Sequence, residues 1–410
     1  MIDWMPRIVS GLGLLMMIAL AWAFSTNRRQ IPWRTVVWGV AIQLSLAIIL
    51  LKTPAGDFFF AVVSRLVDKL LIYTEAGTRF MFGPLLETGA SFALSVLPII
   101  IFMGSLFAVL YHLGWIQGVV RLLARGLSRA MNLSGAESLA AIANVFVGMV
   151  ESCLIVKPYI DRMTSSELFA TMTVGMATVA GSVLIAYVQI LGGGDFAGHL
   201  VTASLMSAPA GLLLAKMIVP EIQTPETATH TTAVVKSEAV NVIDAAAEGA
   251  IEGLRLAAYI GAMLVAFVAL IAFANDLLGG LGAWVGFPDL TLQWILGTML
   301  APLAFMMGIP WSDASTVGAL LGIKTVLNEF IAYQQLGSLI NEGALTQRSQ
   351  IIASYALCGF ANFGSLAILL GGLGGIAPGR RPEVARLGLR SILAGSLATF
   401  MTACVVGMLI

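Results

Sequence analysis

Long apolar stretches follow one another along almost the whole chain, and polar residues are confined to short intervals between them. A helix needs about 20 mostly apolar residues to cross a bilayer. The predicted transmembrane helices are the eight stretches 8–26, 35–51, 92–113, 168–191, 200–219, 254–275, 351–373 and 388–409. The first could be confused with a secretion signal, but Asp3 before it and Arg28-Arg29 after it favour a retained span. We therefore expect an all-α integral membrane protein.

Two further apolar stretches, 135–156 and 312–335, carry polar residues near their middle. The polar residues are Asn144 and Glu151 in the first stretch, and Lys324, Asn328 and Glu329 in the second. Irregular backbone at membrane depth is tolerated only where it is buried in protein or faces a water-filled cavity. These stretches are predicted to be re-entrant helical hairpins.

The two halves of the chain resemble each other at polar as well as apolar positions. GMATVAGSVL (175–184) aligns, with one gap, with GFANFGSLAI (359–368), which pairs Thr178 with Asn362. Each half has the order span, hairpin, span, span. Because three crossings is an odd number, the second copy enters the bilayer from the opposite face. Inverted repeats with broken helices at the midplane are typical of secondary transporters.

This repeat divides the chain into four parts. They are 1–90, N-terminal scaffold spans with an amphipathic interfacial helix at 58–71; 91–219, the first repeat, including a basic amphipathic helix at 115–131; 220–253, a hydrophilic linker and interfacial helix; and 254–410, the second repeat. With both termini outside, fifteen of the 22 Lys and Arg residues fall on the inner side. The excess of basic residues in inner loops supports eight spans with this orientation in a cytoplasmic (inner) membrane.

Composition supports this class and excludes others. Apolar residues make up 59% of the 410 residues and charged residues only 11%, whereas soluble domains carry about 25% charged residues. The net charge is zero and no basic block is present, so we expect membrane lipid and no nucleic acid as a partner. The chain has no zinc-protease or hydrolase motif, so we expect neither an enzyme nor a bound cofactor.

Two carboxylates stand at equivalent breaks of the two hairpins, Glu151 and Glu329. A carboxylate inside the membrane costs about 2.5–3.5 kcal/mol on insertion scales, which indicates a function for both groups. The alternative for Glu329 is that it only neutralises Lys324, five residues earlier. Asn144, the Thr178 hydroxyl and backbone carbonyls at the breaks supply oxygen ligands, which suit a sodium ion.

Four motifs together resemble the concentrative nucleoside transporter family, including its bacterial members: GMVESCLIVKPYI (148–160), GMATVAGSV (175–183), NEFIAY (328–333) and CGFANFGSLAIL (358–369). The resemblance extends from about residue 90 to the C-terminus. It implies eight spans with two opposed hairpins, a homotrimer, and a transport domain that moves like an elevator against a scaffold of the early spans.

The resemblance also implies residue roles at the matching positions. Glu329 would hold ribose hydroxyls, helped by Asn362 and Ser365. Phe360 would pack against the solute, and Val183 would line the base side. The sodium site would consist of Asn144, Thr178 and the carbonyl groups of Val147 and Val179.

The tip of the first hairpin departs from the family pattern. Many members read Gly-Gln-Thr-Glu there, and the Gln and Thr bind the nucleobase. This chain has Gly148-Met149-Val150-Glu151. Glu151 would still contribute to the site, but Met149 and Val150 offer no strong hydrogen bond. A site that lacks a polar partner discriminates poorly between polar analogues. We therefore expect ribose recognition to persist while base selection is broader or leans toward purines.

The sequence leaves several functions open besides sodium-coupled nucleoside symport. Protons could replace sodium as the coupling ion, since a membrane carboxylate such as Glu151 or Glu329 can titrate. A passive channel would need a continuous polar lining, whereas the polar residues here cluster at the breaks. An intramembrane enzyme is disfavoured by the missing motifs.

Overall fold

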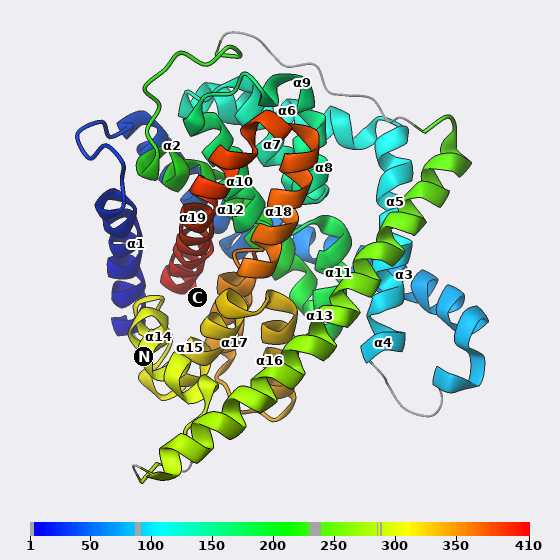
Figure 1. Cartoon of the computed structure of the whole chain (residues 1–410), viewed down its shortest axis with the longest axis vertical. Helices are drawn as coiled ribbons and strands as arrows, with labels where there is room; N and C mark the ends of the chain where they lie inside the picture. The colour runs from blue at the N-terminus through cyan, green and yellow to red at the C-terminus, as the bar shows by residue number, and fades with distance from the viewer. Residues whose placement is uncertain (1–3, 87–91, 229–238, 285, 288) are drawn as a thin grey trace.

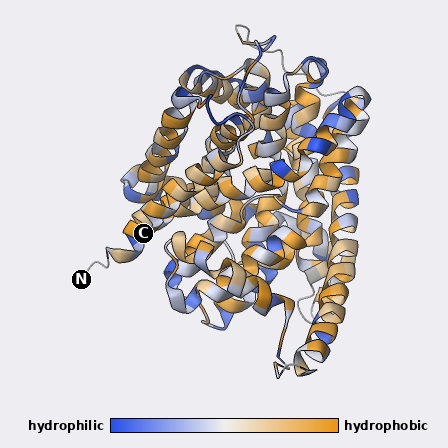
Figure 2. Cartoon of the chain, turned by 60° about the vertical axis from the view of Figure 1, so that its left-hand side comes forward, coloured by the Kyte–Doolittle hydropathy of each residue, from blue (hydrophilic) through white to orange (hydrophobic). Residues whose placement is uncertain are grey.

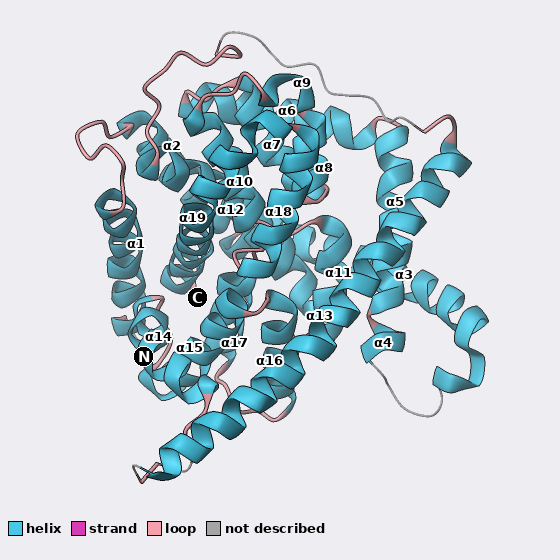
Figure 3. Ribbon diagram, in the orientation of Figure 1, coloured by secondary structure: helices cyan, strands magenta, loops and turns pink. Residues whose placement is uncertain are grey.

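The computed structural model describes residues 4–86, 92–228, 239–284, 286–287 and 289–410, and these residues form helices without any β-strand (Figure 3). Parts of two predicted segments, 87–91 and 229–238, lie outside the described residues. The N-terminal helices are α1 (Met5–Ala23), α2 (Trp33–Lys52), α3 (Pro54–Phe82) and the 3-10 helix η1 (Gly83–Leu86). The first repeat contains α4 (Phe92–Ser95), α5 (Leu97–His112), α6 (Trp115–Met131), α7 (Gly135–Phe146), α8 (Met149–Ile155), α9 (Lys157–Ile160), α10 (Ser165–Ala177), α11 (Gly181–Ile190) and α12 (Asp195–Ile218). The second contains α13 (Val242–Trp284), α14 (Leu292–Met306), α15 (Trp311–Val326), α16 (Glu329–Asn341), α17 (Gln347–Leu357), α18 (Phe363–Ile376), the 3-10 helix η2 (Pro378–Arg380) and α19 (Arg381–Leu409).

The predicted spans correspond to helices of the structure. Among the described residues, seven helical stretches are long and apolar enough to cross a bilayer, and each matches one predicted span. The eighth predicted span, 351–373, consists of α17 and α18, which are separated by residues 358–362. Figure 2 shows hydrophobic residues along most of the length of these helices. The all-α membrane fold is thereby confirmed.

Both predicted hairpins are present. Hairpin 1 is formed by α7 and α8, which are separated at Val147-Gly148, and hairpin 2 by α15 and α16, which are separated at Leu327-Asn328. The base of hairpin 1 lies near the top of the molecule in Figure 1, whereas α14 and α15 lie near the bottom. The two hairpins thus enter the fold from opposite ends, as an inverted repeat requires.

One span of each repeat is also broken, and the two breaks touch. The first break separates α10 from α11 and the second separates α17 from α18. A Cβ atom on Gly359 would lie 2.9 Å from the carbonyl oxygen of Met176 and 3.0 Å from that of Ala177. Only a glycine allows the two broken spans to approach this closely.

The sequence did not predict α14, although it completes the repeat. It precedes hairpin 2 as α6 precedes hairpin 1, and it bends by 116° into α15. The helix α6 carries an alternation of apolar and basic residues that predicts an amphipathic helix. In contrast, α14 is apolar nearly throughout, so it shows no such pattern.

The helices α5 and α13 form a closely packed pair along one side of the molecule (Figure 1). A Cβ atom on Gly104 would lie 2.6 Å from the carbonyl oxygen of Gly249, and one on Gly253 would lie 2.8 Å from that of Ile100. Small residues at this spacing allow two membrane helices to pack backbone against backbone. The interfacial helix predicted within 220–253 is instead the beginning of α13, because the 43-residue helix continues without a break from Val242.

The N-terminal spans pack elsewhere. Helix α1 lies against α19 and α14, and α2 lies against α12 and α19. The interfacial helix predicted at 58–71 lies within the longer α3, which contacts α2, α12 and α5. The assignment of 1–90 to a scaffold remains a prediction.

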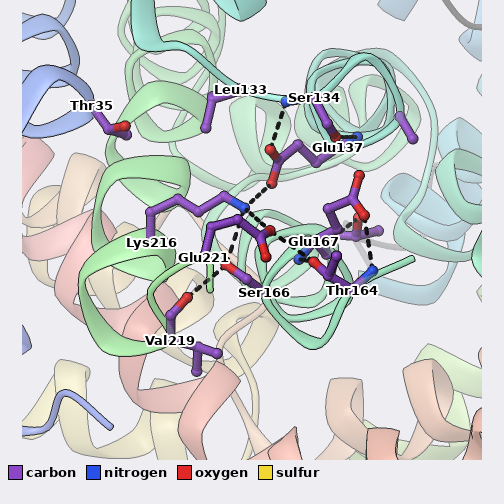
Figure 4. Close-up of polar contacts among 12 residues, drawn as sticks. Thr35, Leu133, Ser134, Glu137, Thr164, Ser166, Glu167, Lys216, Val219 and Glu221 are labelled. Carbon is purple, nitrogen blue, oxygen red and sulfur yellow. Dashed lines mark hydrogen bonds and ion pairs between the residues drawn. The ribbon is translucent and has the colours of Figure 1, made fainter. Parts of the chain in front are cut away.

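A buried ionic cluster centred on Lys216 of α12 lies at the base of hairpin 1 (Figure 4). The ammonium lies 2.8 Å from Glu137 Oε2 and 3.2 Å from Glu221 Oε2, and it donates a hydrogen bond to Ser166 Oγ at 3.0 Å. Glu137 also closes a capping box with Ser134 at the start of α7. Lys216 and Glu137 are both buried. The cluster therefore connects the start of hairpin 1 to the end of α12.

Candidate functional site

The hairpin tips and the broken spans surround a cavity of about 160 Å³, which is room for several water molecules or part of a small solute. All nine residues predicted to bind substrate line this cavity: Gly148, Met149, Val150, Glu151, Val183, Glu329, Phe360, Asn362 and Ser365. The structure thus brings together groups that lie more than 200 positions apart in the sequence.

Four helices begin at the wall of the cavity. Gly148, Ala180, Asn328 and Asn362 line it, and they are the N-caps of α8, α11, α16 and α18. Backbone N–H groups at a helix N-terminus favour negative charge. This arrangement offsets part of the cost of placing carboxylates at membrane depth.

Glu329 is the most tightly held carboxylate at the cavity. It is only 4% exposed, and its two oxygens have different donors. The Tyr187 hydroxyl donates to Oε1 at 2.8 Å, and Asn362 Nδ2 donates to Oε2 at 2.6 Å. Asn362 Oδ1 meanwhile accepts from the backbone N–H of Ser365 at 2.7 Å and caps α18. Hairpin 2 and both broken spans are thereby connected through one carboxylate.

Tyr187 was not predicted from the sequence. Its ring is fully buried, stacks on Tyr333 at 4.5 Å between ring centroids and meets Phe330 edge to face at 4.7 Å. The Tyr333 hydroxyl donates to the carbonyl oxygen of Ser354 at 2.7 Å. The only signal in the sequence was a tyrosine within an apolar span, where buried hydroxyl groups need a partner.

The tip of hairpin 1 lines the same cavity as Glu329. The Glu151 side chain folds back over Gly148, so a Cβ atom at position 148 would lie 2.1 Å from Glu151 Oε2. Met149 is buried, and Val150 packs against α18 at Gly372. The tip therefore presents one carboxylate and two apolar side chains to the cavity.

Another wall comes from α13, which the sequence analysis treated as an ordinary span. Leu256, Tyr259, Ile260 and Met263 line the cavity. These residues follow helical spacing on a single face. Nothing in the apolar pattern of α13 distinguishes this face from those that contact lipid or protein, although Tyr259 is a polar exception.

The residues predicted to hold sodium lie where α7 and α10 end. Val147 is the C-cap of α7 and Thr178 is the C-cap of α10, with Val179 next to it. Asn144 donates to the Thr178 hydroxyl, and to the carbonyl oxygen of Val174 at 3.2 Å. A further side chain, Ser152, was not predicted and donates to Asn144 Oδ1 at 3.3 Å.

This group of oxygens has the chemistry of an alkali-cation site. All the donors are neutral amide, hydroxyl or carbonyl groups, and the carbonyl ends of two helices favour positive charge. The buried Asn144 amide directs its nitrogen toward Thr178 and Val174 and its oxygen toward Ser152, and a flip of the amide would exchange the two. Within the described part of the chain, no three His, Cys, Asp or Glu side chains come together as a site for another metal.

Two opposed hairpins and two broken spans around a cavity with polar groups at its wall define an inverted-repeat membrane transporter. Three family profiles match this chain: "Na+ dependent nucleoside transporter N-terminus" at residues 12–85, "Nucleoside recognition" at 93–194 and "Na+ dependent nucleoside transporter C-terminus" at 199–407. The chain belongs to the concentrative nucleoside transporter family, which consists of transporters rather than enzymes.

Relatives and solved structures agree with this assignment. The chain is 48% identical to the uncharacterized transporter YutK of Bacillus subtilis, over 97% of this chain and 98% of that protein. It is 41% identical to the nucleoside permease NupC of Helicobacter pylori, over 98% of each. Mouse solute carrier family 28 member 3 is 40% identical over 98% of this chain but only 59% of its own length.

Among solved structures, CNTnw in an inward-facing substrate-bound state has a TM-score of 0.92 and 44% identity, over 98% of this chain and 97% of that one. A CNTnw variant in an outward-facing state has a TM-score of 0.94 and 43% identity, over 99% and 98%.

Proposed function

We propose that the protein takes up nucleosides across the cytoplasmic membrane by sodium-coupled alternating access. Family membership supports a nucleoside as the substrate. The observation that carries the proposal is Glu329, a buried carboxylate at the cavity wall that is held from both sides by Tyr187 and Asn362. A carboxylate fixed in this way is an oriented acceptor for a pair of hydroxyl groups.

In this proposal Glu329 accepts hydrogen bonds from the ribose hydroxyls, while Asn362 and Ser365 contact the same sugar. Phe360 packs against the solute, and Val183 lines the space for the base. Charge-assisted hydrogen bonds are about twice as strong as neutral ones, so the sugar supplies most of the polar binding energy. Water replaces the sugar when the site is empty.

Base selection is proposed to be broad or purine-leaning. Met149 and Val150 at the tip of hairpin 1 offer apolar surface to the base, and Glu151 remains as the polar group there. Methionine adapts its shape to flat apolar surfaces. A pocket without a matched polar partner separates nucleobases only weakly.

Sodium is proposed as the coupling ion, bound by oxygens of Asn144, Val147, Thr178 and Val179. The tip of hairpin 1 follows Val147 directly along the chain, so an ion at this position would order Met149 and Glu151 before the nucleoside binds. Sodium and nucleoside would then each raise the affinity for the other, because binding linkage is reciprocal.

The remaining parts of the proposal concern assembly and movement. The hairpins and broken spans would move as one body past α13, the helix that also lines the cavity. The exposed apolar side chains of α13, such as Val265 and Phe273, would meet lipid or the other subunits of a homotrimer. Both termini would lie outside. The hydrogen bonds from Arg7 and Arg348 to the carbonyl oxygen of Ile410 support only that the two ends lie on the same side.

The substitution Glu329→Gln tests the ribose role. Glutamine keeps the shape of the side chain but removes its charge, so nucleoside affinity should fall at least about tenfold. Uptake by reconstituted vesicles measures the effect, and Glu342→Gln at the exposed end of α16 serves as the matched control. A folded Glu329→Gln variant that transports normally would contradict the proposal.

Uptake under imposed gradients tests the coupling. We expect accumulation against a nucleoside gradient when sodium is higher outside, and recovery of the nucleoside chemically unchanged. A response to a proton gradient alone would replace sodium by protons, with Glu151 or Glu329 as the titrating group. Equilibration without accumulation would indicate a passive channel.

A further inference from the structure

Lys324 is a fully buried lysine near the end of α15. Its Nζ atom donates to the carbonyl oxygen of Ala356 at 2.8 Å and to Thr399 Oγ1 at 3.0 Å. None of the carboxylates in the described residues forms an ion pair with it, and both oxygens of Glu329 have other donors. A buried ammonium without a counter-ion is costly and needs an explanation.

The inverted repeat explains the buried position of Lys324, because the two hairpins break at equivalent helix C-termini. Hairpin 1 breaks at Val147, the C-cap of α7, and Asn144 stands three residues before that cap. Hairpin 2 breaks at Leu327, the C-cap of α15, and Lys324 stands three residues before that cap. The two residues therefore occupy equivalent positions in the two repeats.

The surroundings of the two residues correspond as well. Asn144 reaches a carbonyl in the last turn of the broken span α10, that of Val174. Lys324 reaches a carbonyl in the last turn of the broken span α17, that of Ala356. Each position thus lies where the carbonyl ends of two half-helices meet, which is a favourable place for a cation.

The last helix of each repeat adds a hydroxyl group. Ser204 of α12 donates to the carbonyl oxygen of Val179 at 3.1 Å beside the first position. Thr399 of α19 accepts from Lys324 at the second. The first position has only neutral groups, whereas the second already contains an ammonium. This difference between the repeats is the basis of the inference.

We infer that the Lys324 ammonium takes, in the second repeat, the place that sodium takes in the first. The inference rests on the proposed sodium site at Asn144. Lys324 is then a resident cation that neutralises the carbonyl ends of α15 and α17 and moves with the hairpins. Because it is covalently attached, it is never released, and one sodium ion accompanies each nucleoside.

Lys324→Asn is the decisive variant, since it copies the side chain of the first position into the second. Lys324→Met is its matched control, because methionine fills space but offers neither charge nor an oxygen ligand. The experiment measures the melting temperature of the purified protein in sodium chloride and in choline chloride, and sodium activation of nucleoside uptake in vesicles.

In the parent protein sodium should raise the melting temperature, and uptake should rise with a Hill coefficient of about 1. In choline chloride, Lys324→Asn should melt at a lower temperature than the parent. Sodium should raise the melting temperature of this variant by more than it raises that of the parent. The Hill coefficient for sodium activation of uptake should move toward about 2. Lys324→Met should melt lower in both salts and gain no additional response to sodium.

Two results would overturn the inference. One is a Lys324→Asn protein whose melting temperature and uptake respond to sodium as the parent does. The other is a Lys324→Met protein that keeps the stability and sodium response of the parent.

The reverse substitution, Asn144→Lys, separates this inference from the proposed function. Because the lysine ammonium would occupy the proposed sodium site, the melting temperature of Asn144→Lys should no longer respond to sodium. If Asn144→Lys still responds as the parent does, or the parent ignores sodium, the sodium site itself is wrong and the inference falls with it. If Asn144→Lys loses its response to sodium while Lys324→Asn responds to sodium as the parent does, only the inference about Lys324 fails. Asn144→Lys also provides a decisive test if Lys324→Asn does not fold. A sodium response that persists in Asn144→Lys overturns both the proposed sodium site and the inference about Lys324.

Discussion

Asn362 Nδ2 donates to Glu329 Oε2 at 2.6 Å, across the contact between the broken span α17–α18 and hairpin 2. The same asparagine caps α18 through Ser365. The start of one half-helix and the orientation of the buried carboxylate are therefore fixed by a single side chain. Binding geometry at this cavity depends on the backbone breaks as well as on the residues that line it.

The stacked tyrosines behind the cavity should have separable roles. Tyr187→Phe removes the donor to Glu329 Oε1, and hydrogen bonds to charged groups contribute about 1.5–3 kcal/mol, so nucleoside affinity should fall at least about tenfold. Tyr333→Phe removes a bond to a backbone carbonyl, so it should lower the melting temperature and leave affinity nearly unchanged. Concentration-dependent uptake and thermal unfolding measure the two effects. Equal affinity losses in both variants would contradict the assignment.

The crossing of the broken spans should not tolerate a side chain at Gly359. In Gly359→Ala the new Cβ atom would lie 2.7 Å from Thr399 Cγ2 and about as close to two backbone carbonyls. Overpacking of this kind costs about 1–3 kcal/mol, so the melting temperature and the uptake rate should both fall. Gly371→Ala on α18, where the added atom meets open space, is the control. An unchanged Gly359→Ala protein would show that the crossing can widen freely.

The tip of hairpin 1 should control base selection. Competition with all common nucleosides should show weak discrimination in the parent, because Met149 and Val150 offer no strong hydrogen bond. The double variant Met149→Gln, Val150→Thr should sharpen the preference among bases, while competition by free ribose derivatives stays the same. Strict preference of the parent for uridine would contradict this prediction.

The buried pair at the base of hairpin 1 should contribute strongly to stability. Lys216→Met leaves Glu137 buried without its counter-ion, which costs about 3–5 kcal/mol. Arg255→Met breaks a pair with Glu252 in which both side chains are exposed, so it should change the melting temperature little. Thermal unfolding of both variants and the parent in the same detergent gives the melting temperatures to compare. Similar melting temperatures of the two variants would contradict a stabilising role for the buried Lys216–Glu137 pair.

Most of the fold could be predicted from the sequence because a bilayer leaves few alternatives for an apolar chain. Hydropathy located seven spans and both hairpins, since polar residues such as Glu151 and Glu329 interrupt their stretches at membrane depth. The breaks within α10–α11 and α17–α18 were not predicted, because Thr178 and Asn362 read as isolated polar residues in otherwise apolar spans. The uniformly apolar α14 was missed for a similar reason.

The cavity was predicted by residue type and position rather than by shape. All nine candidate residues line it, because the repeat and the family motifs mark the positions where the half-helices begin. Tyr187 and the α13 residues Tyr259 and Met263 were missed. Their contribution depends on which face of a helix meets the hairpins, and the linear pattern of an apolar span carries no such information.

The length of α13 has a practical consequence. Its 43 residues correspond to roughly 65 Å at about 1.5 Å per residue, whereas the hydrocarbon core of a bilayer is about 30 Å thick. Even with the largest tilts found among membrane helices, about 40°, it must project well beyond the hydrocarbon core. Because Tyr259 of the same helix lies at the cavity, a fluorophore attached at the exposed Ile243 would give a reference point in the aqueous phase. Movement of the hairpins relative to α13 could be measured from that point without touching the transported solute.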